Sequence, residues 1–483
     1  MTCSIQGIGT VMIFPCQLVL APPDEDTGRI SRSGCFPPLG LIGIATWLSE
    51  RTGLTTEILD GEILTLQTIA DRLRGGLVGI SISQLTYAHA IDLARIAKGR
   101  GATVVFGGHH ATALAARILT AQPSVDAIVA GDGEEAFAGL ATGLPYENIP
   151  NLVFRDARGV IRHTEHRAMD PRATPIPDRG LVALDPYISR FHSQNPNKPF
   201  RRPFSVWTQK GCAWRDQSGG CAFCARTDHG WRARDATTVW REIKMLCESC
   251  GADYIWELSD DILSNVGWFN TFAETKPPHV NPAFMFYARP AHVTAQAAAC
   301  MARIGAYEVF LGIESGDDAV LRGANRGSTT ATNLRAVKRL SDVGLKTFPS
   351  FVLGLEGESS DSLRKTEEHL KRLLDIASVD TIAVCLFMPL PGSPAYDKLM
   401  NVPEVGAKYA HMDYVPLITL QEEWFSRYCH VTLEELAATR ERMISNAPVA
   451  SGMGVPVRSG LYRISQDRPH EGSLLTRGLV DLA

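Results

Sequence analysis

Three cysteines lie close together near the middle of the chain, in the stretch that runs from Gly211 to Cys224. Cys212, Cys221 and Cys224 follow the spacing Cys-x8-Cys-x2-Cys, and the residues between them are partly glycine and polar. Three thiolates on one glycine-containing loop can hold three corners of an iron–sulfur cubane. The fourth iron would then lack a protein ligand and would be free to bind a small molecule. The spacing therefore predicts a 4Fe-4S cluster with one open iron.

A structural zinc site is the main alternative for these cysteines, and it needs four nitrogen or sulfur ligands. His229, or the pair Cys247 and Cys250, would have to supply the fourth ligand. Cys247 and Cys250 fall on a predicted helix, where ordinary buried cysteines are the more common interpretation. A zinc-stabilised scaffold protein would be colourless and would contain no iron.

The composition narrows the class of protein in which these cysteines act. The chain has 483 residues, of which 45% are hydrophobic and 21% charged, as in ordinary globular enzymes. The formal net charge of −4 predicts no polybasic surface for nucleic acid. No apolar run reaches the roughly 18 residues of a membrane span, and no secretory signal is visible. We therefore expect a cytoplasmic protein whose 11 cysteines are thiols or metal ligands rather than disulfides.

The segment 204–394 must position the cysteine loop, because strand-like and helix-like patterns alternate along it about six times. Such alternation predicts a partial (β/α)6 barrel of the TIM type, with its chemistry at the carboxyl ends of the strands. The cysteine loop follows the first strand. Strands are expected at 204–209, 253–258, 283–287, 307–313, 346–353 and 381–388, and helices at 237–248, 293–304, 330–343 and 360–374.

The first 150 residues alternate in the same way and predict a doubly wound, Rossmann-like α/β domain. Ligands bind over the carboxyl ends of the strands in such sheets. A dinucleotide site is disfavoured, because the loop expected at 14–17 after the first strand lacks Gly-x-Gly-x-x-Gly. Strands are expected at 10–14, 55–59, 78–83, 103–106 and 127–130, and helices at 39–51, 65–74, 87–99 and 112–120.

Two further segments complete the expected organisation. The segment 151–203 is expected to be a linker in which 151–155 and 160–164 form a hairpin before a proline-rich stretch. The segment 395–483 should form a helical tail over the barrel mouth, with a capping box at Thr432 opening a helix to about Ser445 and a loosely ordered end. Candidates for substrate contacts are Trp424, Phe425, Tyr428 and the insert 215–220.

The ordered motifs between 207 and 392 resemble the radical S-adenosylmethionine (SAM) superfamily. After the cysteine loop, these motifs end the second to sixth expected strands: WELSDD at 256–261, YARP at 287–290, LGIESG at 311–316, FVLGLEGE at 351–358 and MPLPGSP at 388–394. The resemblance implies a 4Fe-4S cluster on Cys212, Cys221 and Cys224 with SAM on its open iron. The usual spacing in the superfamily is Cys-x3-Cys-x2-Cys, so this chain carries five extra residues after Cys212.

The resemblance also implies positions for the parts of SAM. An arginine suits the SAM carboxylate because a guanidinium pairs with a carboxylate through two hydrogen bonds. A glycine lets the backbone approach the adenine closely. The implied residues are Phe223 beside the adenine, Glu257 and Asp260 at the amino group, Arg289 at the carboxylate, Glu314 at the ribose or the amine, and Gly354 near the adenine. Asp261 is a weaker candidate for a catalytic acid or base.

The N-terminal domain is similar to the cobalamin-binding domain that precedes many radical SAM cores. Its loops carry glycines that would let a large flat ligand approach the backbone. The Asp-x-His-x-x-Gly signature that supplies a lower histidine ligand to cobalt is absent, so base-off cobalamin is expected. The residues that the resemblance implies are Ser83, Gln84, Gly107, Gly108, His109, Gly131, Gly133 and Glu134.

Taken together, the resemblances imply a cobalamin-dependent radical SAM methyltransferase of class B type. Its substrate would be a small biosynthetic intermediate that is methylated at an unactivated carbon. A 5'-deoxyadenosyl radical would take the hydrogen, methylcobalamin would supply the methyl group, and flavodoxin or ferredoxin would supply electrons. The alternative keeps both cofactors but ends in rearrangement, cyclisation or transfer of another part of SAM.

Overall fold

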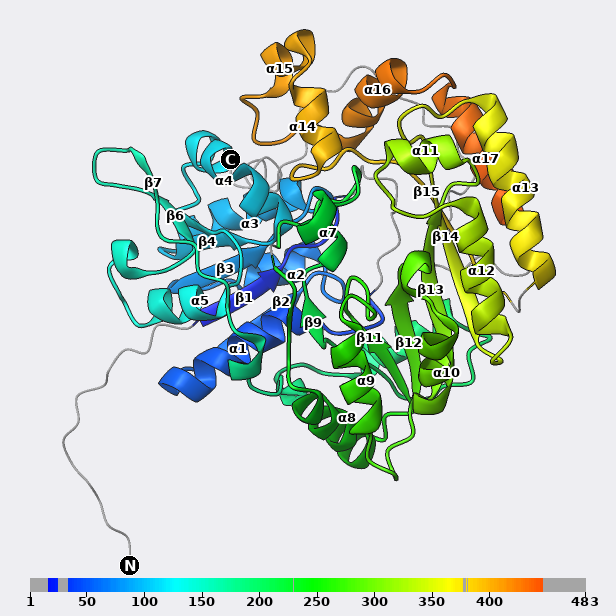
Figure 1. Ribbon diagram of the computed structural model, residues 1–483. Coiled ribbons are helices and arrows are strands. Elements are labelled where there is room, and N and C mark those ends of the chain that lie inside the picture. The colour runs from blue at the N-terminus through cyan, green and yellow to red at the C-terminus, as the bar shows by residue number, and fades with distance from the viewer. Residues whose placement is uncertain (1–15, 25–33, 229, 377–378, 380, 446–483) are drawn as a thin grey trace, which may run out of the picture.

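The computed structural model describes residues 16–24, 34–228, 230–376, 379 and 381–445. These residues form two parallel α/β units and a helical C-terminal region, coloured blue to cyan, green to yellow, and orange in Figure 1. The expected strand at 10–14, His229 and the C-terminal end after 445 lie outside the described residues. None of the described helices combines the length and the apolar character that crossing a membrane requires.

The first unit is built on a sheet that contains seven described strands in the order β2-β1-β3-β4-β5-β6-β7. Strands β1 to β5 run parallel, as predicted, whereas β6 and β7 form an antiparallel hairpin that pairs with β5. The hairpin expected within the linker therefore extends this sheet. The strands are β1 Cys16–Leu20, β2 Thr56–Asp60, β3 Leu77–Ser81, β4 Thr103–Gly107, β5 Ala127–Val129, β6 Leu152–Arg155 and β7 Ile161–His163.

Strand β1 corrects one expectation. Residues 16 and 17, which were expected in a loop, begin the strand, and the loop that follows it starts with Ala21-Pro22-Pro23-Asp24. This loop also lacks Gly-x-Gly-x-x-Gly, so the argument against a dinucleotide site holds at the corrected position.

Helices cover both faces of this sheet, which confirms the doubly wound prediction. Residues of α1 and α5 pack together in one apolar core, while α2, α3 and α4 contribute to the other. Thr65 begins α2 by accepting a hydrogen bond from the Thr68 amide, and Gly53 ends α1 in a left-handed conformation. The helices are α1 Leu39–Thr52, α2 Leu66–Arg72, α3 Tyr87–Gly99, α4 His109–Ala121 and α5 Glu134–Ala141.

The second unit is a partial barrel whose main sheet contains six described parallel strands in the order β15-β14-β13-β12-β11-β8. This confirms the barrel prediction. The strands are β8 Pro203–Val206, β11 Tyr254–Glu257, β12 Ala283–Ala288, β13 Ala306–Glu314, β14 Lys346–Leu353 and β15 Ala383–Leu386, and a short ribbon joins β9 Gln209–Lys210 to β10 Arg232–Ala233.

Helices line the outer face of the barrel, and aromatic side chains fill part of its inside. Phe191 of α6 packs in one buried cluster with Tyr254, Trp256, Met285 and Phe348 from the strands. Helices α6, α7, α9 and α11 were not expected from the sequence. The helices of this region are α6 Asp185–Gln194, α7 Ala213–Ser218, α8 Ala236–Cys250, α9 Val266–Glu274, α10 Ala295–Ile304, α11 Asp318–Gly323, α12 Thr330–Ser341 and α13 Ser360–Ile376.

The first three C-terminal helices arch over one end of the barrel, and the fourth packs beside β15 and α13 (Figure 1). They are α14 Pro394–Met400, α15 Pro403–Tyr409, α16 Leu417–Tyr428 and α17 Leu433–Ser445. Thr432 accepts a hydrogen bond from the Glu435 amide at 3.2 Å, as expected for a helix N-terminus. Between α15 and α16, the chain returns to the first unit, where Asp413 accepts hydrogen bonds from Tyr87 and from Gln122. The tail thus connects the two units.

Candidate functional site

The three cysteines of the predicted cluster line one cavity at the carboxyl ends of the barrel strands. This cavity has a volume of about 220 Å³ and is bordered by Cys212, Cys221 and Cys224. Cys221 is buried and the other two are partly buried. All 10 cysteines among the described residues are free, so the expectation of thiols rather than disulfides is consistent with this part of the chain.

The insert between the first two cysteines is a short helix rather than a loop. Cys212 immediately precedes α7, which ends at Gly219 in a left-handed conformation. Trp214 donates its indole N–H to the Asn325 carbonyl at 2.8 Å, and Asn325 donates its amide to the Gly220 carbonyl at 2.6 Å. The Trp214 ring also lies over Gly327, where an added Cβ would come within 2.5 Å of it. The insert is therefore fastened to the barrel.

Three guanidinium groups lie against the thiols. Arg215 Nη2 is 3.0 Å from Cys224 Sγ. Cys221 Sγ lies 3.4 Å from Arg289 Nη1 and 3.6 Å from Arg326 Nη1. Positive charge and N–H donors stabilise thiolates, which are the form that binds iron.

The donor set suits an iron–sulfur cubane, because cysteine thiolates are the ligands that hold such clusters and three cysteines border one cavity. The shared cavity and the surrounding guanidinium groups match that arrangement.

Four of the predicted SAM-binding residues border the same cavity as the thiols: Phe223, Asp260, Arg289 and Glu314. Glu314 has a φ of 66°, and the strand register shifts between Gly312 and Glu314. A non-glycine residue in this conformation at a strand end is strained, and such strain is common at functional sites. Burial raises the pKa of Glu314, while Arg326, whose Nε is 3.3 Å from its carboxylate, acts in the opposite direction.

The other two predicted SAM-binding residues do not border this cavity. Glu257 is buried and accepts hydrogen bonds from the hydroxyls of Thr208 and Ser259, both at 2.6 Å. Burial raises its pKa to about 7. Gly354 lies under the ring of Phe425, which occupies the space where an added Cβ would lie. Neighbouring side chains contact both residues, and their roles in SAM binding stay predictions.

Asp261, the candidate for a catalytic acid or base, is held in place by neighbouring groups. It is buried, and its carboxylate is 2.5 Å from His292 Nδ1. It also accepts hydrogen bonds from the amides of Leu263 at 3.2 Å and Arg289 at 3.3 Å. These contacts hold the strand end that positions Arg289.

A second cavity, of about 550 Å³, lies between the first sheet and the barrel. Its wall from the first unit is rich in glycine, and it includes five predicted cobalamin-binding residues: Gly108, His109, Gly131, Gly133 and Glu134. A narrow slot of about 90 Å³ borders Gly107, Gly108, Gly131 and Gly133 as well, and is otherwise lined mostly by apolar residues of β1, β3, β4, β5, α1 and α5. The two spaces together offer room for a broad ligand with a narrow extension, which fits a corrin with an extended tail.

Ser83 and Gln84 do not border either space. The Ser83 amide donates to the Thr86 hydroxyl at 2.9 Å within a turn. Gln84 is buried and donates its side-chain amide to the Val415 carbonyl at 2.7 Å. The C-terminal segment contacts Gln84, and a cobalamin contact by these two residues stays a prediction.

Arg226 and Asp260 border both the thiol-lined cavity and the second cavity, which lies between the two units and is called the interdomain cavity below. Arg226 Nε is 3.3 Å from the Asp260 carboxylate, and its Nη1 is 3.0 Å from His109 Nε2 of the first unit. The surrounding protein, and then the charge of Arg226, lower the pKa of His109. The two cavities therefore meet at an ionic contact between the two units.

Asp132 fixes this boundary from the side of the first unit. Its carboxylate is 2.7 Å from both Lys210 Nζ and Arg232 Nη1, which flank the cysteine loop in the chain. It also accepts a hydrogen bond from the Met169 amide at 3.0 Å. These cationic and N–H partners hold the pKa of Asp132 down, at about 2, although burial opposes them.

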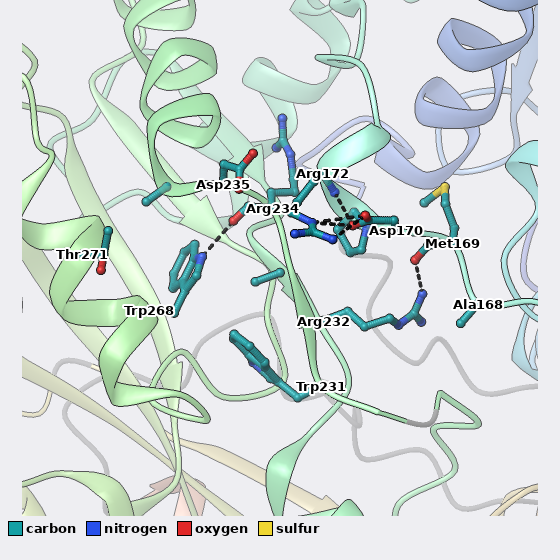
Figure 2. A pocket seen from close by; sticks show the side chains of 13 residues that line it. Ala168, Met169, Asp170, Arg172, Trp231, Arg232, Arg234, Asp235, Trp268 and Thr271 are labelled. Carbon is teal, nitrogen blue, oxygen red and sulfur yellow. Dashed lines mark hydrogen bonds and ion pairs between the residues drawn. The ribbon is translucent and has the colours of Figure 1, made fainter.

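A third cavity, of about 640 Å³, lies away from the thiols, between the segment 168–172 and helix α9. Figure 2 shows Arg172 paired with Asp170, and the indole of Trp268 bonded to the Arg234 carbonyl. Trp231 lies beside them and donates its indole N–H to Gln209. None of the described residues predicted to bind a cofactor borders this cavity.

The sequence did not indicate Arg226 or Arg326 as site residues. Arg326 follows α11 and has no motif of its own, and Arg226 differs from other surface arginines only by its place two residues after Cys224. That proximity to a predicted cluster ligand was the one usable signal.

Comparison with known proteins agrees with this division of the chain. Residues 27–141 match the model of the B12 binding domain, and residues 208–370 match the model of the radical SAM superfamily. The first match covers the glycine-rich face, and the second begins just before the cysteine loop.

Individual relatives share both parts. An uncharacterized methyltransferase of Pyrococcus horikoshii is 26% identical over 79% of this chain and 82% of its own length. The anaerobic magnesium-protoporphyrin IX monomethyl ester cyclase of Cereibacter sphaeroides is 21% identical over 80% of this chain and 64% of its own length. The solved structure of the radical SAM methyltransferase TsrM from Kitasatospora setae, with cobalamin and a 4Fe-4S cluster bound, has a TM-score of 0.63, is 18% identical and covers 80% of this chain and 79% of that one. The chain is therefore a cobalamin-dependent radical SAM enzyme, in which a B12-binding domain precedes a radical SAM domain.

Proposed function

We propose that this enzyme is a methyltransferase that acts on an unactivated carbon of a small biosynthetic intermediate. The observation that carries this proposal is the meeting of the thiol-lined and glycine-rich cavities at Arg226 and Asp260. When bound, the reduced cluster and SAM supply a hydrogen-abstracting 5'-deoxyadenosyl radical, and cobalamin supplies a methyl group. A substrate at the junction would be within reach of both.

In this proposal, Cys212, Cys221 and Cys224 hold the cluster. Asp260 borders the same cavity as the thiols and offers a carboxylate for the SAM amino group. Arg289 is held by its stacking on Trp214, with its guanidinium carbon 4.8 Å from the ring centroid. It can therefore present its charge to an anionic group at little further entropic cost.

The first domain would hold cobalamin through shape rather than through a ligand to cobalt. Gly131 and Gly133 leave space along the wall of the interdomain cavity, and Gly107 opens the slot beneath it. His110 is buried and contacts the Asp413 carbonyl at 3.3 Å. His109 is the histidine that reaches the cavity.

The enzyme needs an external electron donor, as radical SAM enzymes do, and we propose flavodoxin or ferredoxin for that role. Two comparisons support methyl transfer, because the P. horikoshii relative and TsrM are both described as methyltransferases. The similarity to a cyclase over 80% of the chain favours radical cyclisation as the second candidate.

Product analysis distinguishes the two outcomes. Anaerobically reconstituted enzyme would be incubated with SAM carrying a deuterated methyl group, a low-potential reductant and candidate substrates. Methyl transfer predicts both 5'-deoxyadenosine and S-adenosylhomocysteine, and a product that carries the label. Deoxyadenosine with an unlabelled product would contradict the proposal and favour cyclisation. A Cys224→Ala variant should form neither 5'-deoxyadenosine nor the labelled product.

A further inference from the structure

Helix α7 brings a positive charge to the thiol of Cys224. Arg215 Nη2 is 3.0 Å from Cys224 Sγ, and its Nη1 donates to the Asp228 carbonyl at 2.7 Å. The two other arginines at the thiols, Arg289 and Arg326, contact Cys221. Among the described residues, Arg215 is therefore the arginine that donates to Cys224.

Several contacts around α7 hold this arginine in place. Asp216, the next residue, accepts hydrogen bonds from the amides of Gly230 and Trp231, both at 3.0 Å. On the other side, Trp214 is bonded to Asn325 at 2.8 Å. The backbone on both sides of Arg215 is thus anchored, so little conformational entropy is lost when its guanidinium contacts the sulfur.

A guanidinium at a ligand sulfur affects the two redox states of a cluster unequally. Reduction adds one electron from an external donor, so the reduced cluster carries one more negative charge than the oxidised one. A cationic N–H donor at a cysteine sulfur therefore stabilises the reduced cluster more and raises its reduction potential. SAM cleavage requires the reduced state, so such a contact would make that state easier to reach.

We infer that the inserted helix α7 tunes the cluster, with Arg215 raising its reduction potential through Cys224. Arg215 is then a positioning residue that acts through the sulfur and touches no substrate. The inference rests on the proposed ligation of the cluster by Cys212, Cys221 and Cys224. It gives the insert 215–220 a role in electron transfer rather than in substrate contact.

The test is a potentiometric titration of anaerobically reconstituted full-length enzyme, followed by the electron paramagnetic resonance signal of the reduced cluster. Arg215→Leu removes both the charge and the donors, and Arg215→Lys keeps the charge. Arg335→Leu is the matched control, because Arg335 is exposed on α12 and bonds to Thr332 of the same helix. Iron and sulfide content confirm that each variant holds a complete cluster.

In Arg215→Leu, the ratio of reduced to oxidised cluster at a fixed potential should fall about tenfold, which for one electron corresponds to about 59 mV. Arg215→Lys should show a smaller shift, and Arg335→Leu none. A complete cluster with the wild-type potential in Arg215→Leu would overturn the inference. If Arg215→Leu loses its cluster, Arg215→Gln is measured instead. A lowered potential then supports the inference, and the wild-type potential overturns it.

The failure of the proposed ligation would look different. In that case Cys224→Ala would retain the full iron content and the wild-type signal. An unchanged potential in Arg215→Leu, together with loss of the cluster in Cys224→Ala, would reject only the tuning role.

Discussion

The slot beneath the interdomain cavity offers a sharp test of cobalamin binding, through the substitution Gly107→Leu. Gly107 ends β4 and borders the slot. An added Cβ would meet only the Val129 carbonyl oxygen, at 4.0 Å, and the residue does not need a left-handed φ. A leucine can therefore be accommodated by the backbone, and its side chain would extend into the slot.

The expected size of the effect follows from overpacking of the slot. The slot has a volume of about 90 Å³, and the leucine side chain would take up part of it. A ligand tail would then have to displace or compress this side chain, and overpacking of this kind costs about 1–3 kcal/mol. The dissociation constant for cobalamin should therefore rise about 5- to 150-fold.

The assay is anaerobic titration with hydroxocobalamin, followed by desalting and the absorbance of the retained corrin. Gly99→Leu serves as the control, because Gly99 is exposed on α3 and an added Cβ there meets nothing within 4 Å. Thermal unfolding of the cobalamin-free variants should show similar midpoints. Wild-type affinity in Gly107→Leu would refute the assignment of the slot to the cobalamin tail, whatever its effect on catalysis.

Three other predictions concern the cluster, a buried carboxyl group and the domain boundary. Replacing Cys212, Cys221 and Cys224 together by alanine should reduce iron to background in anaerobically prepared protein; unchanged iron would reject these ligands. Burial raises the pKa of Glu257 from 4.5 to about 7, so its ionisation should reduce wild-type stability as pH rises from about 4.5 to 7. Glu257→Gln should lose this pH dependence of the unfolding free energy, which amounts to at most about 3 kcal/mol. If urea unfolding shows the same change between pH 5 and pH 8 in the wild type and in Glu257→Gln, the prediction is contradicted. Asp132→Asn should lower the free energy of unfolding by roughly 3 kcal/mol because two ion pairs between the units are lost, and a change within 0.5 kcal/mol would argue against that role.

The fold was largely predictable because the strands are short apolar runs separated by helix-like patterns. The exception at β1 shows the limit of this signal. Residues 10–14 and 16–20 are two neighbouring apolar runs on either side of Pro15, and periodicity does not choose between them. Pairing places 16–20 in the sheet, since Cys16 lies opposite both Thr56 and Leu77. Such long-range partners are not visible in a local pattern.

The site was predictable where a residue's role depends on its place at a strand end. The carboxyl ends of parallel strands meet at one edge, so Asp260, Arg289 and Glu314 reach the cavity of the thiols. Glu257 and Gln84 also lie at or after strand ends, but they do not border these cavities. They bond instead to the hydroxyl of Thr208 and the carbonyl of Val415. A place at a strand end thus brings a residue to the edge of the sheet where the site lies, and tertiary contacts decide whether its polar group remains available.

The same reasoning explains why so many charged contacts link the two units. A reaction that draws on two separately bound cofactors depends on their relative position, and small displacements in such sites reduce rates strongly. Asp132 connects the first unit to both sides of the cysteine loop, and Asp413 connects the tail to α3. Arg226 joins His109 and Asp260 at the junction itself. These contacts join the two units, and those of Arg226 lie where the two cavities meet, so they hold the glycine-rich face and the thiols in a fixed relation.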